Sequence, residues 1–293
     1  MSKNGRHSLR TKGTSPRPDP RFGHRSRGIG QNDKKWANYV KENPFSDAHE
    51  ILHKSITYFG IHMGTSPTLH FALDFDGTIC PIDTTDFLLE TFADPQWHAI
   101  ESRWQAGAIS SRECLAEQVA LIRATPEDIR RALADITLDP DVVRFVAAVR
   151  SVGADVSVVS DGFDISILPL LAAAGLDLPV SCNRMLPVGT DRWVASFSNA
   201  SEGCGSGTCK CAATEAATRL VLVGDGRSDF CVARRADLVL AKGSLATFCA
   251  EEALPHVAIS SFADALAALP ALFPEMSPPM PASAGPSFED LNA

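Results

Sequence analysis

Short apolar runs alternate with longer amphipathic segments along most of the chain. Five runs predict buried strands, over residues 69–75, 155–160, 220–223, 238–241 and 256–260. Between and after these runs, apolar residues recur at helical spacing and predict helices over 140–152, 165–175, 228–235, 244–253 and 262–272. Strands that alternate with helices are typical of a parallel, doubly wound sheet. We therefore expect an α/β fold of the Rossmann-like kind.

Two segments depart from this alternation. Residues 84–137 have helical periodicity and almost no strand character, and they predict four helices, over 84–93, 95–106, 110–123 and 126–136. This block is too long for a crossover loop. We therefore expect a helical cap over residues 83–137, inserted into an α/β core formed by residues 69–82 and 138–273. A second departure is a hairpin predicted over 179–187 and 193–198.

The charge is distributed unevenly between the two parts of the chain. Residues 1–68 hold 12 Lys and Arg against 5 Asp and Glu, whereas the remainder holds 15 against 30. Residues 1–35 and 274–293 have too few apolar residues to offset the entropy of ordering, so we expect both to be disordered. A short helix is predicted over 47–57. The predicted core needs nothing before Met63, so the start of the chain could even be assigned too far upstream.

Composition excludes several classes of protein. With 45% hydrophobic and 21% charged residues, the chain is globular rather than wholly disordered or fibrous. No apolar run is long enough to span a membrane, and no secretory signal is visible. Most of the eight cysteines lie among apolar residues, which indicates buried free thiols and a reducing, cytoplasmic compartment. The basic arm could contact nucleic acid, but without regular aromatic residues or a recognisable fold we expect no such partner.

Small oxygen-bearing residues follow three of the predicted strands. The first strand ends in Asp74-Phe75-Asp76-Gly77-Thr78, the second in Ser160-Asp161-Gly162, and the third in Gly224–Asp229 (GDGRSD). Ligands of open α/β sheets bind beyond the carboxyl ends of the strands. At one strand end, these residues could be explained by the tendency of Asp, Ser and Gly to form turns. Three ends in a single sheet, with five aspartates among them, predict a functional site.

Four converging carboxylates need a positive counter-charge. At about 4 Å and an effective dielectric constant of ~20, each pair among Asp74, Asp76, Asp225 and Asp229 repels by about 4 kcal/mol. Oxygen ligands of this kind favour Mg²⁺. Lys210 is a second candidate, because it opens the predicted helical stretch KCAATEAA, where the helix dipole disfavours a cation unless an anion faces it.

The spacing of Asp74 and Asp76 has a chemical use. In a continuing strand, residues i and i+2 face the same side of the sheet. One carboxylate can attack a phosphorus atom to give an aspartyl-phosphate, and the other can protonate the leaving oxygen and then deprotonate water. The acid needs a pKa above the ordinary value of ~3.9, which neighbouring carboxylates can supply.

Taken together, these segments and Lys210 resemble the four motifs of the haloacid dehalogenase superfamily, in the family's order. The helical insert is similar to the cap of its phosphoserine-phosphatase-like branch. Asp83-Thr84-Thr85-Asp86 and the Cys-Gly…Cys-Lys text at 204–210 look most like the methionine-salvage phosphatases of the MtnX type. These enzymes dephosphorylate 2-hydroxy-3-keto-5-methylthiopentenyl-1-phosphate.

The resemblance implies a Mg²⁺-dependent phosphomonoesterase that acts on a small phosphorylated metabolite. It makes Asp74 the nucleophile and a metal ligand, and Asp76 the general acid and base, with a backbone carbonyl that also binds the metal. A true dehalogenase lacks the second aspartate, so Asp76 argues against dehalogenation. The remaining implied roles are phosphate binding by Thr78, Ser160, Asp161, Gly162 and Lys210, and metal binding by Asp225 and Asp229, of which Asp229 supports metal-bound water or Lys210.

The substrate is less well defined than the chemistry. Candidate selectors on the cap are Asp83, Asp86, Arg103 and Arg112. Phosphoserine phosphatase is an alternative, because Asp86 or Glu90 with Arg103 could hold an amine and a carboxylate. Transfer of the phosphoryl group to an alcohol is another.

The cysteines at 204, 209 and 211 lie close together in the sequence. No fourth zinc ligand is evident near them, so a zinc site is not predicted and their role stays open.

Overall fold

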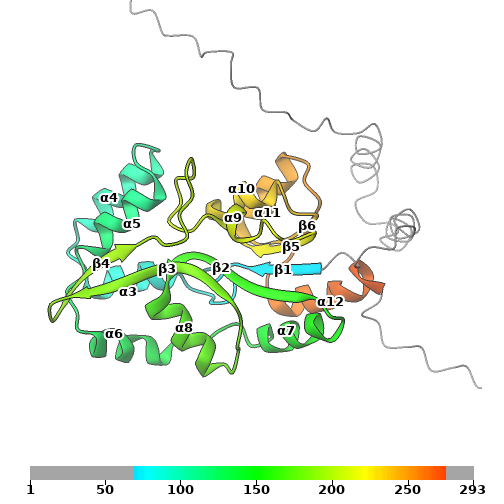
Figure 1. Cartoon of the computed structure of the whole chain (residues 1–293), viewed down its shortest axis with the longest axis horizontal. Coiled ribbons are helices and arrows are strands. Elements are labelled where there is room, and N and C mark those ends of the chain that lie inside the picture. Colours follow the sequence, from blue (N-terminus) through cyan, green and yellow to red (C-terminus); the bar gives the residue numbers. More distant parts are fainter. Residues whose placement is uncertain (1–68, 275–293) are drawn as a thin grey trace, which may run out of the picture. The chain divides into compact units, whose positions relative to one another are not determined.

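The computed structural model describes residues 69–274, which are built around a seven-stranded sheet (Figure 1). The strand order is β4-β3-β2-β1-β5-β6-β7, and every neighbouring pair is parallel except β3 with β4. The predicted basic arm, its helix over 47–57 and the tail beyond residue 274 lie outside the described residues. The strands are β1 (Leu69–Leu73), β2 (Asp155–Phe163), β3 (Val180–Val188), β4 (Arg192–Ser196), β5 (Arg219–Gly224), β6 (Leu238–Ala241) and β7 (His256–Ala258).

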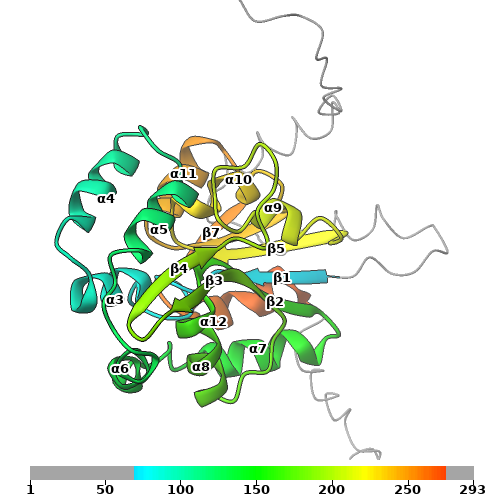
Figure 2. The same ribbon diagram turned by 60° about the vertical axis from the view of Figure 1, so that its left-hand side comes forward.

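Helices cover both faces of the sheet, as the alternation of strands and helices predicts. In Figures 1 and 2, α7, α8 and α12 lie on one face, and α9, α10 and α11 lie on the other. These helices are α7 (Val142–Ser151), α8 (Asp164–Ala173), α9 (Lys210–Ala213), α10 (Phe230–Ala233), α11 (Gly243–Glu251) and α12 (Phe262–Leu272). The doubly wound α/β architecture expected from the sequence is therefore confirmed.

The largest apolar cluster lies between the sheet and the layer of α7, α8 and α12. Strand β1 is central, between β2 and β5, which explains why its run is apolar on both faces. Phe145 of α7 packs edge-on against Phe71 of β1, with ring centroids 5.8 Å apart, and against Phe262 of α12, at 5.0 Å. These rings hold the two helices against the strand whose end carries Asp74.

The block between β1 and α7 is helical, as its periodicity predicts. It comprises α3 (Thr84–Phe92), α4 (Trp97–Gln105), α5 (Ser111–Val119), α6 (Pro126–Ala132) and the 3₁₀ turn η1 (Leu133–Asp135). Its apolar residues form a second cluster that includes Met185 and Trp193 of the β3–β4 hairpin. The Trp193 indole N–H also donates to the Ala124 carbonyl at 2.9 Å. The helices thus share one apolar core with the β3–β4 hairpin. The cap predicted over residues 83–137 does not include this hairpin.

Three elements near the predicted site differ from the sequence-based expectation. Strand β2 continues to Phe163, and its pairing with β3 shifts between Val159 and Phe163, so Ser160–Gly162 lie in an irregular part of the strand rather than after it. The helix expected over 228–235 is a 3₁₀ turn, η2 (Arg227–Asp229), followed by the short α10. Helix α9 has four residues and ends where the Thr214 hydroxyl donates to the Lys210 carbonyl at 2.8 Å.

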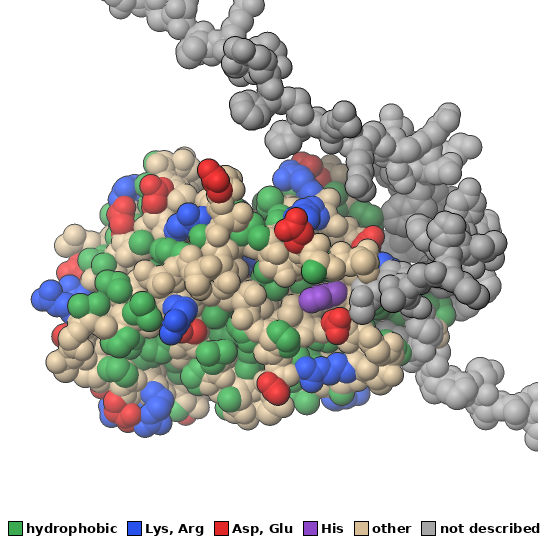
Figure 3. Space-filling view, viewed as in Figure 1, with side chains coloured by type: hydrophobic (Ala, Val, Ile, Leu, Met, Phe, Trp, Pro, Cys, Tyr) green, Lys and Arg blue, Asp and Glu red, His purple; other side chains and the backbone are tan. Residues whose placement is uncertain are grey.

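The described surface carries both signs of charge. On the face drawn in Figure 3, basic and acidic side chains are interspersed, without a continuous basic patch. No helix found within residues 69–274 combines the length and apolar character needed to cross a membrane.

Removal of the Phe145 ring tests the packing of the core. We expect Phe145→Ala to lower the free energy of unfolding by about 3–5 kcal/mol, because it leaves a cavity between β1, α7 and α12. Urea unfolding measures this change. Val143→Ala, on the exposed side of the same helix, is the matched control and should cost about 0.5 kcal/mol or less. Equal losses in the two variants would contradict this account of the core.

Candidate active site

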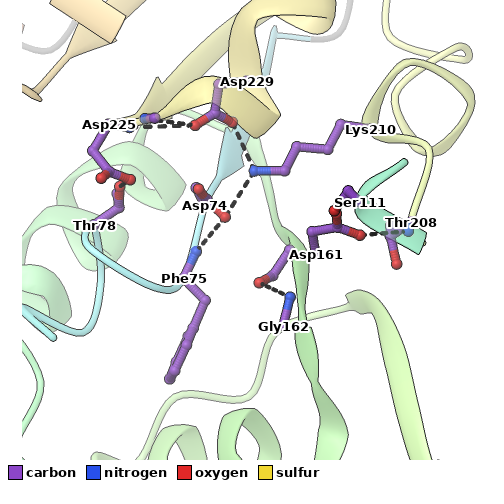
Figure 4. Close-up of polar contacts among 12 residues, drawn as sticks. Asp74, Phe75, Thr78, Ser111, Asp161, Gly162, Thr208, Lys210, Asp225 and Asp229 are labelled. Atoms are coloured by element: carbon purple, nitrogen blue, oxygen red, sulfur yellow. Dashed lines mark hydrogen bonds and ion pairs between the residues drawn. The ribbon is translucent and has the colours of Figure 1, made fainter. Parts of the chain in front are cut away.

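Asp74 lies where β1 ends, at the carboxyl edge of the sheet (Figure 4). Its backbone N–H donates to the Val223 carbonyl of β5 at 2.8 Å, which fixes the backbone at this point. The side chain is buried, with 4% exposure. Its Oδ1 accepts from the Phe75 N–H and binds the Lys210 ammonium, both at 2.8 Å. Oδ2 has no hydrogen-bond partner among residues 69–274, and Asp74 lines a cavity.

Lys210 joins Asp74 to Asp229. Its buried ammonium lies 2.7 Å from Asp229 Oδ1 and 2.8 Å from Asp74 Oδ1. Burial lowers the pKa of Lys210, but Asp229 and Asp74 raise it further, so the net pKa is above its ordinary value. The side chain is therefore charged. The dipole argument for Lys210 is weak, because a helix of four residues has little dipole, and these two ion pairs explain its position instead.

Asp225 completes a group of three carboxylates. One oxygen each from Asp74, Asp225 and Asp229 lies within 4.8 Å of the others. The Thr78 hydroxyl donates to Asp225 Oδ1 at 3.0 Å. Burial, and then Asp229, raise the pKa values of both Asp74 and Asp225. Three carboxylates with one ammonium retain excess negative charge, and these oxygen donors fit a hard divalent cation.

Two glycines permit this close approach. A Cβ on Gly77 would overlap the Asp225 carboxylate, and one on Gly224 would overlap that of Asp229. Gly77 also has a φ of +71°, which L residues rarely adopt. Gly77 and Gly224 are therefore required by the carboxylates beside them, and Gly77 also by its backbone conformation.

Asp76 is held by a different part of the chain from the three carboxylates. The chain leaves the strand directly after Leu73, so strand geometry does not set the direction of Asp76. Asp74 and Asp76 nevertheless line the same cavity. Asp76 Oδ1 accepts from the Thr84 N–H at 2.8 Å and from its hydroxyl at 2.7 Å. Burial, and next the charge of Asp83, raise the pKa of Asp76 to about 7.

The second oxygen of Asp76 faces β2. A Cβ on Gly162 would overlap Asp76 Oδ2, and no hydrogen bond to this oxygen comes from residues 69–274. The Gly162 N–H donates to the buried Ser160 hydroxyl at 2.9 Å. The irregular part of β2 thus brings Ser160 and Gly162 to the same cavity as Asp74 and Asp76.

Asp161 connects three segments of the chain. Its carboxylate accepts from the Ser111 hydroxyl of α5 at 2.7 Å and from the Thr208 N–H at 2.8 Å (Figure 4). Asn183 of β3 donates to the Asp161 carbonyl at 2.5 Å. The side chain of Asp161 therefore ties the helical block and the segment before Lys210 to β2.

A cavity of about 240 Å³ opens over these residues. Beyond the strand ends, its walls come from the helical block and from η2. Helix α5 lines it with one face, at positions i, i+3, i+4 and i+7 (Ser111, Cys114, Leu115 and Gln118). Glu101 and Trp104 of α4 and Arg227 of η2 also line it. Reasoning from the sequence missed these wall residues, although the spacing along α5 was a usable signal.

The predicted substrate selectors divide into two groups. Asp83 and Asp86 line the cavity. The Asp83 carboxylate caps α3 by accepting from the Asp86 N–H, whereas burial in the cavity wall raises the pKa of Asp86 to about 6. Arg103 and Arg112 do not line the cavity, which corrects the expectation that they face the substrate. Arg103 pairs instead with Glu117 at 2.6 Å on the surface.

Arg112 holds a loop. Its guanidinium donates to the carbonyls of Cys204, at 2.7 Å, and Ser206, at 3.0 Å. The cysteine-containing stretch before Lys210 is thus fastened to α5 through its backbone. All eight cysteines of the chain have free thiols, and five of them are buried.

One predicted phosphate ligand needs reassignment. Thr78 is fully buried, is absent from the cavity wall and directs its hydroxyl to Asp225. It orients a carboxylate rather than facing a ligand.

Replacement of Lys210 tests whether the ion pairs carry stability. We expect Lys210→Met to lower the free energy of unfolding by about 3–5 kcal/mol, because Asp74 and Asp229 stay buried without their cation. Urea unfolding in the presence of a chelator measures this. Lys242→Met is the matched control, since the Lys242 ammonium forms no ion pair within residues 69–274 and lies 3.5 Å from the Thr78 carbonyl. A loss below 1 kcal/mol for Lys210→Met would contradict the account.

Comparisons with known proteins agree with this geometry. The haloacid dehalogenase-like hydrolase family matches residues 71–234. The chain is 31% identical over 206 residues to a 2-hydroxy-3-keto-5-methylthiopentenyl-1-phosphate phosphatase of Brevibacillus brevis, covering 66% of this chain and 91% of the relative. It is 29% identical over 204 residues to a protein of the same name from an Exiguobacterium species, covering 67% and 94%.

A solved phosphoserine phosphatase, captured as a phospho-aspartyl intermediate analogue, shares the fold. The TM-score is 0.51 at 20% identity, over 69% of this chain and 99% of that one. The match of more than half of the chain to one family, together with relatives named as phosphatases, leads to one conclusion: this chain belongs to the haloacid dehalogenase-like hydrolases and is a phosphatase of that family.

Proposed function

We propose that the chain hydrolyses a small phosphomonoester through an aspartyl-phosphate on Asp74. The observation that carries this proposal is the pairing of two differently placed carboxylates at one cavity. Asp74 is held by Lys210 with one oxygen open, and Asp76 is held by Thr84 with one oxygen open. We assign the role of nucleophile to Asp74 and the role of acid to Asp76.

The first half of the reaction forms the phosphoenzyme. Asp74 Oδ2 attacks phosphorus as the bond to the ester oxygen breaks, and the leaving oxygen takes a proton from Asp76. The contacts of Oδ1 with Lys210 and the Phe75 N–H fix the carboxylate in one orientation, so that little freedom is lost on reaction.

The second half returns the enzyme to its starting state. Asp76, now ionised, takes a proton from a water molecule, whose oxygen attacks phosphorus and breaks the bond to Asp74. A pKa of about 7 suits a group that must both give and take a proton near neutral pH. Inorganic phosphate and the alcohol are the products.

Phosphoryl oxygens need donors from the chain. Ser160 and the backbone of Asp161–Gly162 line the cavity beside Asp76, and the Lys210 ammonium lies beside Asp74. We assign phosphate binding to these groups. Lys210 would then exchange part of its contact with Asp74 for one with the phosphoryl group, while Asp229 keeps it in place.

Asp74, Asp225, Asp229 and the Asp76 backbone carbonyl are the groups that we assign to Mg²⁺. The ion would neutralise charge on the phosphoryl oxygens and lessen repulsion between the phosphate and the carboxylates. Thr78 orients Asp225 through its hydrogen bond, and Asp229 accepts from the Asp225 N–H at 3.3 Å, so the donor set is fixed by the chain itself.

The relatives suggest the substrate. Their named substrate, 2-hydroxy-3-keto-5-methylthiopentenyl-1-phosphate, is a small phosphoester with hydroxyl, keto and thioether groups. We propose a substrate of this kind, because the cavity wall carries the acidic side chain of Asp86 together with the apolar side chains of Trp104 and Leu115. The alternative of phosphoserine loses one of the groups that could hold it, since Arg103 pairs with Glu117 instead of lining the cavity.

Conservative replacements test the two carboxylate roles. We expect Asp74→Asn to reduce kcat by at least about 10³-fold, because the amide is a poor nucleophile. Asp76→Asn should reduce kcat by about 10²–10⁴-fold through loss of proton transfer. Phosphate release from a panel of metabolite esters with Mg²⁺ measures both. The control is Asp177→Asn, an exposed position away from the cavity. If the wild-type protein released no phosphate from any ester, the proposed function would be wrong.

Thermal unfolding tests the metal site without reference to activity. We expect Mg²⁺ at 10 to 100 times its Kd to stabilise the wild-type protein by about 1.4–2.7 kcal/mol, seen as a higher Tm. Asp225→Asn should lose most of this response, because a carboxylate donor is removed. Asp177→Asn again serves as the control. An equal rise in Tm for all three proteins would place Mg²⁺ binding elsewhere.

A further inference from the structure

Arg227 is the one cationic side chain on the cavity wall formed by residues 69–274. It opens η2, two residues after Asp225 and two before Asp229, so its backbone is fixed by the same turn that positions those carboxylates. The proposed mechanism gives it no role. Six side-chain carboxylates besides that of the nucleophile also line this cavity, at positions 76, 83, 86, 101, 161 and 225.

The guanidinium of Arg227 is not engaged by those carboxylates. Within the described part of the chain it forms no ion pair and no hydrogen bond. It makes a cation–π contact with Trp104 of α4, whose ring centroid lies 5.2 Å from the Arg227 Cζ. A cation over an aromatic face is attracted to the ring and keeps its N–H groups free at the edge. Trp104 therefore holds Arg227 at the cavity while leaving its donors available.

Other groups on the wall restrict what these donors can meet. Asp86 and Glu101 also line the cavity, and Glu101 is fixed by the Gln118 amide at 3.0 Å. Two acids would repel a second anionic group on a substrate but would accept from a hydroxyl. Arg227 supplies donors for an uncharged oxygen acceptor such as a ketone, and Leu115 offers apolar contact.

We propose that Arg227, held by Trp104, determines specificity by donating to a carbonyl oxygen in the non-phosphoryl part of the substrate. This inference rests on the proposed phosphatase function and extends it to the substrate class: neutral keto-phosphomonoesters, with a hydroxyl group directed to Asp86 or Glu101. Arg227 acts in binding and takes no part in the transfer of the phosphoryl group.

A pair of substrates that differ at the carbonyl tests this assignment. Hydroxyacetone phosphate and propyl phosphate have the same length, and only the first carries a ketone. We expect the wild-type protein to favour the ketone in kcat/KM, chiefly through KM. Arg227→Met should reduce the ratio of the two kcat/KM values by about 10- to 100-fold, the range for loss of a hydrogen bond from a charged donor. Trp104→Ala should reduce it in the same direction, and Trp104→Phe less.

Controls separate this role from a purely structural one. Arg130→Met removes an exposed arginine of α6 that pairs with Glu127, and should leave the ratio at the wild-type value. A contact that merely holds the helical block in place would affect both esters equally, so a ratio in Arg227→Met within about threefold of wild type overturns the inference. A wild-type preference for phosphoglycolate, which carries a carboxylate, over hydroxyacetone phosphate also overturns it. Failure of the wild-type protein on every ester would instead refute the phosphatase function itself.

Discussion

The ion pairs of Lys210 with Asp74 and Asp229 are the interaction on which the site depends. Buried carboxylates at the ends of β1 and β5 would repel one another without this ammonium, which lies 2.7–2.8 Å from both. The fold brings these groups together because β1 and β5 are adjacent and parallel, so that their carboxyl ends meet at one edge. Lys210 comes from a segment more than 130 residues after Asp74, and its position depends on the loop that precedes it.

That loop also connects the chemistry to the walls of the cavity. Asp161 on β2 binds Ser111 of the helical block on one side and Thr208, two residues before Lys210, on the other. Arg112 of the same helix binds the loop further upstream. A shift of α5 would therefore disturb the segment that delivers Lys210. The wall that contacts a substrate and the cation that compensates the nucleophile belong to one hydrogen-bonded network.

Much of this arrangement could be predicted from the sequence. Asp74, Ser160 and Asp225 were located because apolar strands of a parallel sheet end at one edge, and the helical block was evident from its periodicity. The roles of Thr78, Arg103 and Arg112 were assigned wrongly because the sequence does not show which partner a side chain points to. Their partners in the structure are, respectively, Asp225, Glu117 and the backbone carbonyls of residues 204 and 206. Arg227 stands inside a motif that was recognised, but its meaning depends on Trp104, which is more than 120 residues away.

The hydrogen bonds from Arg112 to the loop have a consequence for how the sequence of this protein can vary. The arginine binds carbonyl oxygens, which every amino acid provides, so the side chains at positions 204 and 206 contribute nothing to the contact. Evolution can exchange the cysteines and serines there while the contact persists. An insertion or deletion, by contrast, would move both the carbonyls and Lys210 out of register. At positions 204 and 206 the loop is thus free in composition, whereas its length is restricted. Homologues should therefore differ more readily in the residues at these two positions than in the number of residues in the loop.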